Sequence, residues 1–437
     1  MHYYSTNKNA PLASLEEAVI KGLAPDKGLY MPELIHRLPD PFFHNIHEMS
    51  LQDIAFVVAS AFFGEDIEAK RLQEIVNETL NFEIPLVNVT DSIYSLELFH
   101  GPTAAFKDVG ARFMARLLGY FIERDQQKRT VNVLVATSGD TGSAVANGFF
   151  RVPGIRVFVL YPKGKVSEIQ EKQFTTLGNN ITALEINGTF DDCQRLVKEA
   201  FMDEELNDRM FLTSANSINV ARFLPQAFYY FHAYAQYKRA GNTDDPVICV
   251  PSGNFGNLTA GLFAKRMGLP VKRFIAANNR NDIFLQYLTT GVYSPRPSIQ
   301  TIANAMDVGD PSNFARILDL YEHSHEAICK DITGVSYTDE QIAHTVARIF
   351  DQENYLLDPH GACAYQALED LLQPGEKGIF LETAHPAKFK DTVEPIIGEG
   401  VVVPATLRHF MTGVKHTEQL SSDYRSFRKL LMDNSAE

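Results

Sequence analysis

The first 84 residues carry apolar side chains at the three- and four-residue spacing of amphipathic helices. Three segments show this pattern: SLEEAVIKGL (14–23), LQDIAFVVASAFF (51–63) and EAKRLQEIVNETLNF (68–82). A Gly-Leu-Tyr-Met-Pro stretch near residue 30 separates the first segment from the other two. The pattern therefore predicts a mainly helical N-terminal domain over residues 1–84.

From residue 85 onward, short β-branched runs alternate with helical segments. The alternation is seen in residues 130–150, 155–164, 246–268 and 271–279, where apolar strands lead into glycine-rich turns and helices. Strands that alternate with helices predict an α/β fold with parallel sheets covered on both faces. Ligands of such sheets bind at the carboxyl ends of the strands, which is where both glycine-rich turns fall.

Composition and charge narrow the classes of function. The chain has 437 residues and a formal net charge of −14, which argues against binding to nucleic acid or to an anionic membrane surface. No signal peptide pattern and no apolar run of about 18 residues is present. The four cysteines form no CxxC pair, so we expect them to be buried free thiols. His323 and His325 lack metal-site spacing, so we expect no metal centre. We expect a cytoplasmic protein.

The stretch PSGNFGNLTAG, residues 251–261, has the features of a phosphate-binding loop. Gly253 and Gly256 allow a tight turn close to a ligand, and the following helix directs free N–H groups at the loop. Neither the ATP-binding GxxxxGK[ST] pattern nor the dinucleotide GxGxxG fingerprint is present. On its own, the stretch is equally compatible with a strand-to-helix turn that binds nothing.

A second glycine turn, ATSGDTGSA at 136–144, adds hydroxyl groups that suit a carboxylate or phosphate. Its hydroxyl donors are Thr137, Ser138, Thr141 and Ser143. Asp140 is the exception, because its charge would repel an anion unless it faces another polar group. The simpler interpretation is a hydroxyl-rich helix cap.

Lys107, in FHGPTAAFKDVG (99–110), precedes a helix that the pattern predicts to be buried. The apolar stripe of that helix consists of Val109, Phe113, Met114, Leu117, Leu118, Phe121 and Ile122. A cation in the first turn is disfavoured by the helix dipole, which favours the neutral amine needed by a nucleophile. The alternative is a solvated lysine paired with Asp108.

Two further stretches are richer in polar residues than packing requires. NSINVARFLPQ (216–226) contains Arg222, which could bind a phosphate in bidentate fashion, and LETAHPAKFK (381–390) contains Thr383, His385 and Lys388. Taken singly, either stretch could be an ordinary solvated loop.

Together, AFKDVG, SGDTGSA, SGNFGN and TAHPAKF resemble the threonine synthases, which are pyridoxal 5'-phosphate (PLP) enzymes of fold type II. The resemblance also covers LASLEEAVIKGLAPDKGLYMPE, LYPKGK and SANSIN. With these segments included, the chain resembles the longer bacterial and fungal members of the family. It implies a tryptophan synthase β-like fold: an N-terminal domain at 1–84, and a catalytic region at 85–437 with large and small α/β subdomains. The small subdomain is expected within 105–235. The resemblance also implies a monomer.

The resemblance assigns roles to individual residues. Lys107 would form the Schiff base with the cofactor, and Thr383 would face the ring nitrogen in place of a carboxylate, which favours elimination or replacement over transamination. Asp140 stands where many fold type II relatives have an asparagine beside the cofactor's 3-oxygen. The cofactor phosphate would be held by Gly253, Asn254, Phe255, Gly256 and Asn257. The substrate would be held by Thr137, Ser138, Gly139, Thr141 and Gly142, together with Ser217, Asn219 and Arg222.

The implied reaction is conversion of O-phospho-L-homoserine and water to L-threonine and phosphate by β,γ-elimination and β-hydration, the last step of threonine biosynthesis. Two alternatives remain open. A related PLP-dependent phospho-lyase would release 2-oxobutanoate from the same substrate. A non-catalytic sensor of phosphorylated metabolites would keep both anion-binding loops but would not need Lys107.

Overall fold

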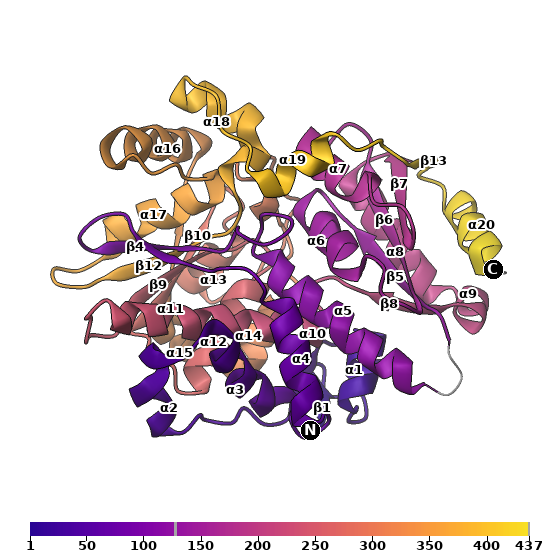
Figure 1. Ribbon diagram of the computed structural model, residues 1–437, viewed down its shortest axis with the longest axis horizontal. Coiled ribbons are helices and arrows are strands. Elements are labelled where there is room, and N and C mark those ends of the chain that lie inside the picture. Colours follow the sequence, from indigo (N-terminus) through magenta and orange to yellow (C-terminus); the bar gives the residue numbers. More distant parts are fainter. Residues whose placement is uncertain (126–128, 436–437) are drawn as a thin grey trace.

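The computed structural model describes residues 1–125 and 129–435. Its N-terminal part pairs two short strands, β1 (Tyr3–Ser5) and β2 (Tyr30–Pro32), which run antiparallel. The helices of this part lie together at the bottom of Figure 1. They are α1 (Leu15–Lys21), α2 (Asp40–Asn45), α3 (Leu51–Phe63) and α4 (Ala69–Thr79), with a 3-10 turn η1 at Ile46–Glu48. The predicted helices are therefore confirmed.

The N-terminal helices share their core with the rest of the chain. Phe63 packs against Phe113 of the central helix α5 (Lys107–Arg124), with ring centroids 5.1 Å apart. Phe62 packs against Phe263 of α12 (Gly256–Arg266) at 6.2 Å. Because one hydrophobic cluster runs through all three elements, the N-terminal part packs into the rest of the chain.

A six-stranded sheet forms the centre of the larger α/β unit. Its strand order is β11-β10-β9-β12-β4-β3, and all neighbours are parallel except β3 and β4. The strands are β3 (Leu86–Asn88), β4 (Ile93–Glu97), β9 (Val247–Pro251), β10 (Arg273–Asn278), β11 (Ile332–Ser336) and β12 (Gly378–Glu382). Along β9, Val247 and Cys249 face one core cluster while Ile248 and Val250 face another, so both faces of the sheet are buried.

Helices surround this sheet on its two sides (Figure 1). Besides α12, they are α11 (Ala227–Arg239), α13 (Ile283–Thr290), α14 (Phe314–Leu320), α15 (His325–Asp331), α16 (Asp339–Glu353), α17 (Pro359–Leu371) and α18 (Lys390–Ile397). Three short 3-10 segments lie among these elements: η2 (Leu224–Gln226) before α11, η3 (Asn304–Met306) between α13 and α14, and η4 (Pro386–Phe389) before α18.

A second, fully parallel sheet of five strands has the order β13-β7-β6-β5-β8. Its strands are β5 (Val131–Ala136), β6 (Ile155–Pro162), β7 (Ile181–Asn187), β8 (Phe211–Ser214) and β13 (Glu418–Ser421). The helices that accompany it are α6 (Asp140–Phe149), α7 (Glu168–Thr175), α8 (Phe190–Met202) and α9 (Glu204–Arg209). The short helix α10 (Val220–Phe223) follows β8 and packs against α5 and α12. The predicted pair of parallel-type sheets is confirmed.

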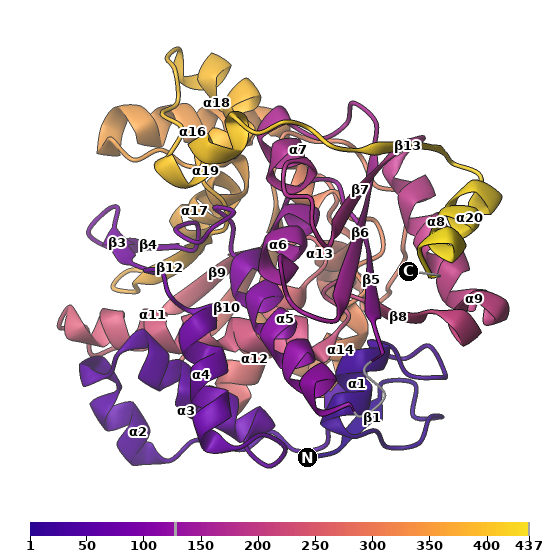
Figure 2. The ribbon, with the colours of Figure 1, turned by 45° about the vertical axis from the view of Figure 1, so that its right-hand side comes forward.

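The C-terminal segment joins the two α/β units. After α19 (Ala405–Met411) the chain passes α7, adds β13 to the edge of the five-stranded sheet and ends in α20 (Tyr424–Ser435), which lies beside α8 (Figure 2). The range 105–235 expected for the small subdomain contains β5 to β8 but not β13. That strand pairs with β7 across more than 200 residues of sequence, a long-range pairing that local periodicity cannot indicate.

The described residues contain neither a helix that could span a membrane nor a cluster that could bind a metal ion. None of their helices is long and apolar enough to cross a membrane. Within residues 1–125 and 129–435, no group of three or more His, Cys, Asp or Glu side chains could hold a metal ion. Of the four cysteines expected to be buried, Cys329 is exposed and the other three are buried.

Candidate active site

Lys107 is the first residue of α5, and the turn before it is tied to the segment after β12. The amide of Phe106 donates to the carbonyl oxygen of Thr383 over 2.8 Å, and the amide of His385 donates to the carbonyl oxygen of Ala104 over 3.1 Å. An antiparallel bridge between Ala105 and Ala384 completes this junction. Lys107 and Thr383, 276 positions apart in the chain, are thereby brought to one place.

Asp108 does not pair with Lys107, so the alternative of a simple surface ion pair is wrong. The Asp108 carboxylate is fully buried and accepts bonds from the amide and the hydroxyl of Thr103, at 2.8 and 2.6 Å. Burial raises the pKa of this carboxyl group, although the bonds from Thr103 oppose the shift. The Asp108 side chain closes the turn before α5 and leaves the Lys107 amine without an ion-pair partner.

The Lys107 amine lies where its charged form is disfavoured. Desolvation lowers its pKa, Asp140 acts in the opposite direction, and the cations Lys388 and Arg222 lower it further. The Lys107 amine has no hydrogen bond or ion pair with any of the described residues, and its Nζ lies 5.7 Å from the centroid of the Phe106 ring. A lysine with a depressed pKa and no partner is suited to act as a nucleophile and base.

The loop that begins at Gly253 joins β9 to α12 and presents a row of unpaired amides. Within the described part of the chain, the N–H groups of residues 253–257 have no acceptor. A Cβ on Gly253 would lie 2.7 Å from Met306 Cα, so only glycine fits where η3 approaches the loop. Phe255 adopts a left-handed conformation at the helix N-cap, with φ of 59°. This arrangement forms a nest for an anion.

Side chains of the same loop hold it in shape. Asn257 accepts from the Ser252 hydroxyl at 2.6 Å and donates to the carbonyl of Pro251 at 3.0 Å. Asn254 donates to the Ser217 hydroxyl at 2.7 Å and accepts from the amide of Ser312 at 2.6 Å. Asn254 and Ser217, both predicted site residues, are therefore in direct contact, whereas the Asn257 side chain turns inward.

The turn between β5 and α6 is organised by Thr137. Its hydroxyl accepts from the amides of Gly139 at 2.9 Å and Gly142 at 2.8 Å, and donates to the carbonyl of Gly139. Gly139 has φ of 149°, and a Cβ there would collide with Gln170, so the position requires glycine. The amides of residues 138, 140 and 141 have no acceptor within the described chain and remain available for an anion. We assign Thr137 to the support of this turn.

Asp140 begins α6 and is paired with a lysine that the sequence did not lead us to assign. Its Oδ1 lies 2.7 Å from Lys388 Nζ and accepts from the Gln170 amide at 2.8 Å. Burial alone would raise the pKa of the carboxyl group, but Lys388 and Lys107 lower it to about 2. The expected repulsion between Asp140 and an anion in the turn is thus offset by this cation.

Arg222 provides a buried cation near Lys107. The guanidinium donates to the carbonyl of Ala215 at 2.6 Å, and its Nε has no partner in the described structure. Desolvation lowers the pKa of Arg222 to about 10, and the charge of Asp108 opposes that shift. A buried guanidinium with an unpaired N–H is suited to receive an anionic ligand such as a phosphate.

Asn219 is directed away from this anion site. Its amide nitrogen donates to the carbonyls of Val19 and Ser214, at 2.7 and 3.3 Å, while its oxygen caps α10 by accepting from Ala221 at 3.0 Å. The side chain is fully buried. We therefore assign Asn219 to anchoring this loop on α1.

Comparison with known proteins places the chain in a family. Its residues 85–378 match the family model of pyridoxal-phosphate dependent enzymes, residues 2–80 match the threonine synthase N terminus, and residues 361–431 match the C-terminal threonine synthase model. The threonine synthase of Escherichia coli (strain K12) is 44% identical, with 99% of this chain and 100% of that protein covered. The chain belongs to the threonine synthase family.

Solved threonine synthases have the same architecture. The E. coli crystal structure superposes with a TM-score of 0.91 at 42% identity, covering 99% of this chain and all of that one. The PLP-bound threonine synthase of Brucella melitensis gives 0.94 at 33% identity over 100% of both chains. Maize serine racemase, at 16% identity and a TM-score of 0.53 over 78% of this chain, shares the fold. The fold type II assignment is confirmed.

Arg316 is a structural support of the site that the threonine synthase motifs did not single out. It is fully buried without a carboxylate partner, and its guanidinium donates to the carbonyls of Tyr30, Ser217 and Ile218 and to the side chain of Asn313. Desolvation lowers its pKa to about 9. Arg316 thus joins the N-terminal part to the Ser217 loop. The polar run DPSNFAR (310–316) was the available sequence signal.

A buried acidic network lies behind Thr383. Glu382 Oε1 accepts a hydrogen bond from the amide of Asp358 at 2.7 Å, and Asp358 Oδ1 accepts one from His360 Nδ1 at 2.5 Å. His360 Nε2 in turn accepts from the amide of Ala305, next to Met306 and the Gly253 loop. Desolvation and the neighbouring Asp358 raise the pKa of Glu382 well above its usual range, and Glu382 Oε2 has no partner in the described structure. The network supports both the Thr383 segment and the anion nest.

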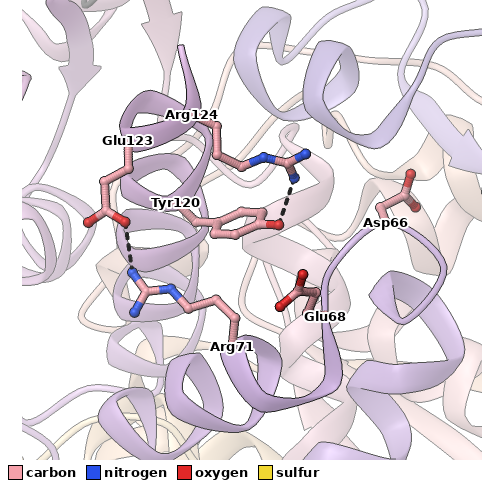
Figure 3. A pocket seen from close by; sticks show the side chains of 6 residues that line it. All are labelled: Asp66, Glu68, Arg71, Tyr120, Glu123 and Arg124. Atoms are coloured by element: carbon pink, nitrogen blue, oxygen red, sulfur yellow. Dashed lines mark hydrogen bonds and ion pairs between the residues drawn. The ribbon is translucent and has the colours of Figure 1, made fainter. Parts of the chain in front are cut away.

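A surface pocket of about 430 Å³ lies elsewhere, between α4 and the far end of α5. Figure 3 shows its six lining side chains, with Arg71 bonded to Glu123 and Arg124 bonded to the Tyr120 hydroxyl. Tyr120 follows Lys107 by 13 residues on the same helix, which corresponds to about 20 Å along the axis. The pocket therefore does not belong to the Lys107 site, and its two arginines already have hydrogen-bond partners.

Proposed function

We propose that this threonine synthase family member converts O-phospho-L-homoserine and water to L-threonine and phosphate, with pyridoxal phosphate as its cofactor. The observation that carries the proposal is the partly buried Lys107 amine, which has no hydrogen-bond or ion-pair partner and lies within the electrostatic influence of Asp140 and Arg222. The backbone hydrogen bond from Phe106 to Thr383 brings this amine close to the Thr383 segment. A sensor that only binds metabolites would gain nothing from such an amine.

The residues fit the cofactor. The unpaired amides of residues 253–257 suit its phosphate, the Lys107 amine suits its aldehyde, and the Thr383 hydroxyl suits its ring nitrogen. Thr383 is buried, and its hydroxyl has no hydrogen bond to another described residue. When bound, the cofactor supplies an electron sink that stabilises negative charge on the carbon skeleton of an amino acid.

The substrate has two anionic groups, and the site offers two further places for anions. We assign its carboxylate to the free amides of residues 138, 140 and 141, at the N-terminus of α6. We assign its phosphate to Arg222, Ser217 and Asn254, with the guanidinium supplying charge. Together with the nest for the cofactor phosphate, three anion sites match the three anionic groups that the reaction brings together.

Lys107 has the role of base. Its neutral amine removes the proton from Cα of the substrate, and the resulting ammonium returns a proton later in the cycle. Arg222 stabilises the charge that develops on the departing phosphate oxygen. A proton leaves Cβ as the Cγ–O bond to the phosphate breaks, which leaves a double bond between Cβ and Cγ. Cγ then gains a proton and becomes the methyl group, and water adds its oxygen at Cβ to give the hydroxyl group of threonine, so that one water is consumed and one phosphate is released.

The product distinguishes this reaction from its nearest alternative. Holoenzyme incubated with O-phospho-L-homoserine should give threonine and phosphate in equal amounts by NMR, and Lys107→Ala should give neither. Lys198→Ala on the exposed face of α8 is the matched control and should retain full activity. Formation of 2-oxobutanoate would instead establish a phospho-lyase, and absence of turnover in the wild-type holoenzyme would reject the substrate assignment.

We also propose that the chain acts as a monomer in the cytoplasm. Light scattering on the purified holoenzyme measures its mass and thereby tests the monomer.

A further inference from the structure

Lys388 is a second buried lysine at the site, and its contacts differ from those of Lys107. Its side chain is fully buried in η4, immediately after the Thr383 segment. The Nζ atom lies 2.7 Å from Asp140 Oδ1 and 2.7 Å from the carbonyl oxygen of Thr103, to which it donates. Both contacts have the short length of charge-assisted hydrogen bonds.

These contacts connect elements of both α/β units. Asp140 begins α6 of the five-stranded sheet, whereas Lys388 follows β12 of the six-stranded sheet. The Ser167 hydroxyl, at the N-cap of α7, also reaches the carbonyl of Lys388 at 3.3 Å. The Lys388 side chain therefore holds Asp140 at a fixed place in the junction between the two units.

Without Lys388, the buried carboxylate of Asp140 would need another cation. Gln170 would remain as a neutral donor to Oδ1, but a neutral amide does not balance a buried charge. Lys107 is already coupled electrostatically to Asp140 and has no other partner. An ion pair between Lys107 and Asp140 would keep the amine protonated, and a protonated amine can neither attack a carbonyl carbon nor accept a proton.

We infer that Lys388 is a positioning residue that binds the Asp140 carboxylate and thereby prevents Lys107 from being trapped in an ion pair with it. The inference rests on the proposed role of Lys107 as the cofactor lysine. It goes beyond that role because it explains why Asp140 pairs with Lys388 and leaves the Lys107 amine without an ion-pair partner. Lys388 acts through Asp140, so it is not itself a catalytic residue.

Other charged groups near Lys107 do not offer the same compensation. Arg222 is also a cation, and the Asp108 carboxylate already accepts hydrogen bonds from the amide and the hydroxyl of Thr103. His385 stands three residues before Lys388, and burial lowers its pKa to about 4, so it is neutral at physiological pH. Asp140 is therefore the carboxylate for which Lys107 and Lys388 compete.

The test measures the protonation of Lys107 without using catalysis. Full-length protein freed of cofactor is pulse-acetylated across a pH series, and the acetylated fraction of the peptide containing Lys107 is quantified by mass spectrometry. Only the neutral amine reacts. We expect Lys388→Met to raise the midpoint of the Lys107 profile by about 1–3 pH units, the range that an opposite charge within a few ångströms produces. An unchanged midpoint would overturn the inference.

Two further variants make the result decisive. Asp140→Asn/Lys388→Met removes both charges and should return the midpoint to the wild-type value or below it. A double variant with the same raised midpoint as Lys388→Met would show that Asp140 is not the competing group. Lys388→Gln retains donors for Asp140 and Thr103, and it serves as the test if circular dichroism shows that Lys388→Met is unfolded; it too should raise the midpoint.

Failure of this inference is distinguishable from failure of the proposed function. If the wild-type holoenzyme carries its cofactor on Lys107 but the Lys388 variants leave the midpoint unchanged, only the inference is overturned. If the cofactor is attached to another lysine, the role proposed for Lys107 fails and the inference fails with it.

Discussion

The amide of Phe106 donates a 2.8 Å hydrogen bond to the carbonyl oxygen of Thr383, and this bond joins the N-terminus of α5 to the end of β12. Residues from distant parts of the chain are brought together by this junction, because Lys107 follows Phe106 and Lys388 lies five residues after Thr383. The geometry of the site thus depends on two short segments that hold each other through backbone atoms. Side chains at 107 and 383 can be changed without removing that bond.

Thr383→Val tests the hydroxyl proposed to face the cofactor ring nitrogen. Valine keeps the shape but loses the hydrogen bond, and a neutral hydrogen bond contributes about 0.5–1.5 kcal/mol. We expect kcat to fall about 3- to 10-fold and the absorbance spectrum of the holoenzyme to shift, while the melting temperature changes little. Thr383→Ser should keep most of the activity. Equal loss in the serine and valine variants would contradict a role for the hydroxyl.

Arg222→Gln tests the buried cation assigned to the substrate phosphate. Hydrogen bonds to charged groups contribute about 1.5–3 kcal/mol, so KM should rise about 10- to 100-fold. The kcat should fall as well, because Arg222 also stabilises the charge on the departing phosphate. Inhibition by inorganic phosphate should weaken in parallel, which a purely structural effect would not require. Arg222→Lys should recover part of the affinity, because it restores the charge without the planar guanidinium. Unchanged KM and phosphate inhibition in the glutamine variant would reject this assignment.

Gly253→Ala tests the close approach of η3 to the anion nest. The added methyl group would lie 2.7 Å from Met306 Cα, so backbone must move, at a cost of about 1–3 kcal/mol in the free energy of unfolding. We also expect the affinity for pyridoxal phosphate to fall at least about tenfold, as measured by fluorescence titration. Gly400→Ala is the control, because only Glu394 Oε1, at 3.9 Å, comes near its added Cβ. Wild-type cofactor affinity in the Gly253 variant would place the phosphate elsewhere.

Much of the fold and the outline of the site could be predicted from the sequence. The helices at 15–21 and 51–63 and the strands at 131–136 and 247–251 follow from local periodicity. Lys107 and the 253–257 loop are placed by short motifs that are contiguous in the chain. The pairing of Asp140 with Lys388 could not be predicted in this way, because it depends on side chains 248 positions apart. The hydrogen bond from the Asn219 side chain to Val19 could not be predicted for a similar reason, because Val19 belongs to the N-terminal part.

Glu382→Gln tests the buried acid behind Thr383 through the pH dependence of stability. Because the pKa of Glu382 is raised by desolvation and by Asp358, the folded state binds its proton more tightly than the unfolded state does. Its contribution to stability is therefore present below the unfolded pKa of about 4.5 and is lost as the pH rises toward the folded value.

Glutamine cannot release a proton, so the unfolding midpoint of Glu382→Gln in guanidinium chloride should fall less between about pH 5 and pH 8 than that of the wild type. The exposed Glu399→Gln variant is the control and should follow the wild-type curve. Parallel curves for wild type and Glu382→Gln over this range would show that Glu382 is ionised in the folded protein.

The most direct test of the account is to locate the lysine that carries the cofactor. Holoenzyme is reduced with borohydride, which fixes pyridoxal phosphate to its lysine, and digested for peptide mass spectrometry. We expect one modified residue, Lys107, and no modification at the buried Lys388. Modification of Lys388 in place of Lys107 would contradict the account at its centre, because the two lysines would then have exchanged the roles assigned to them.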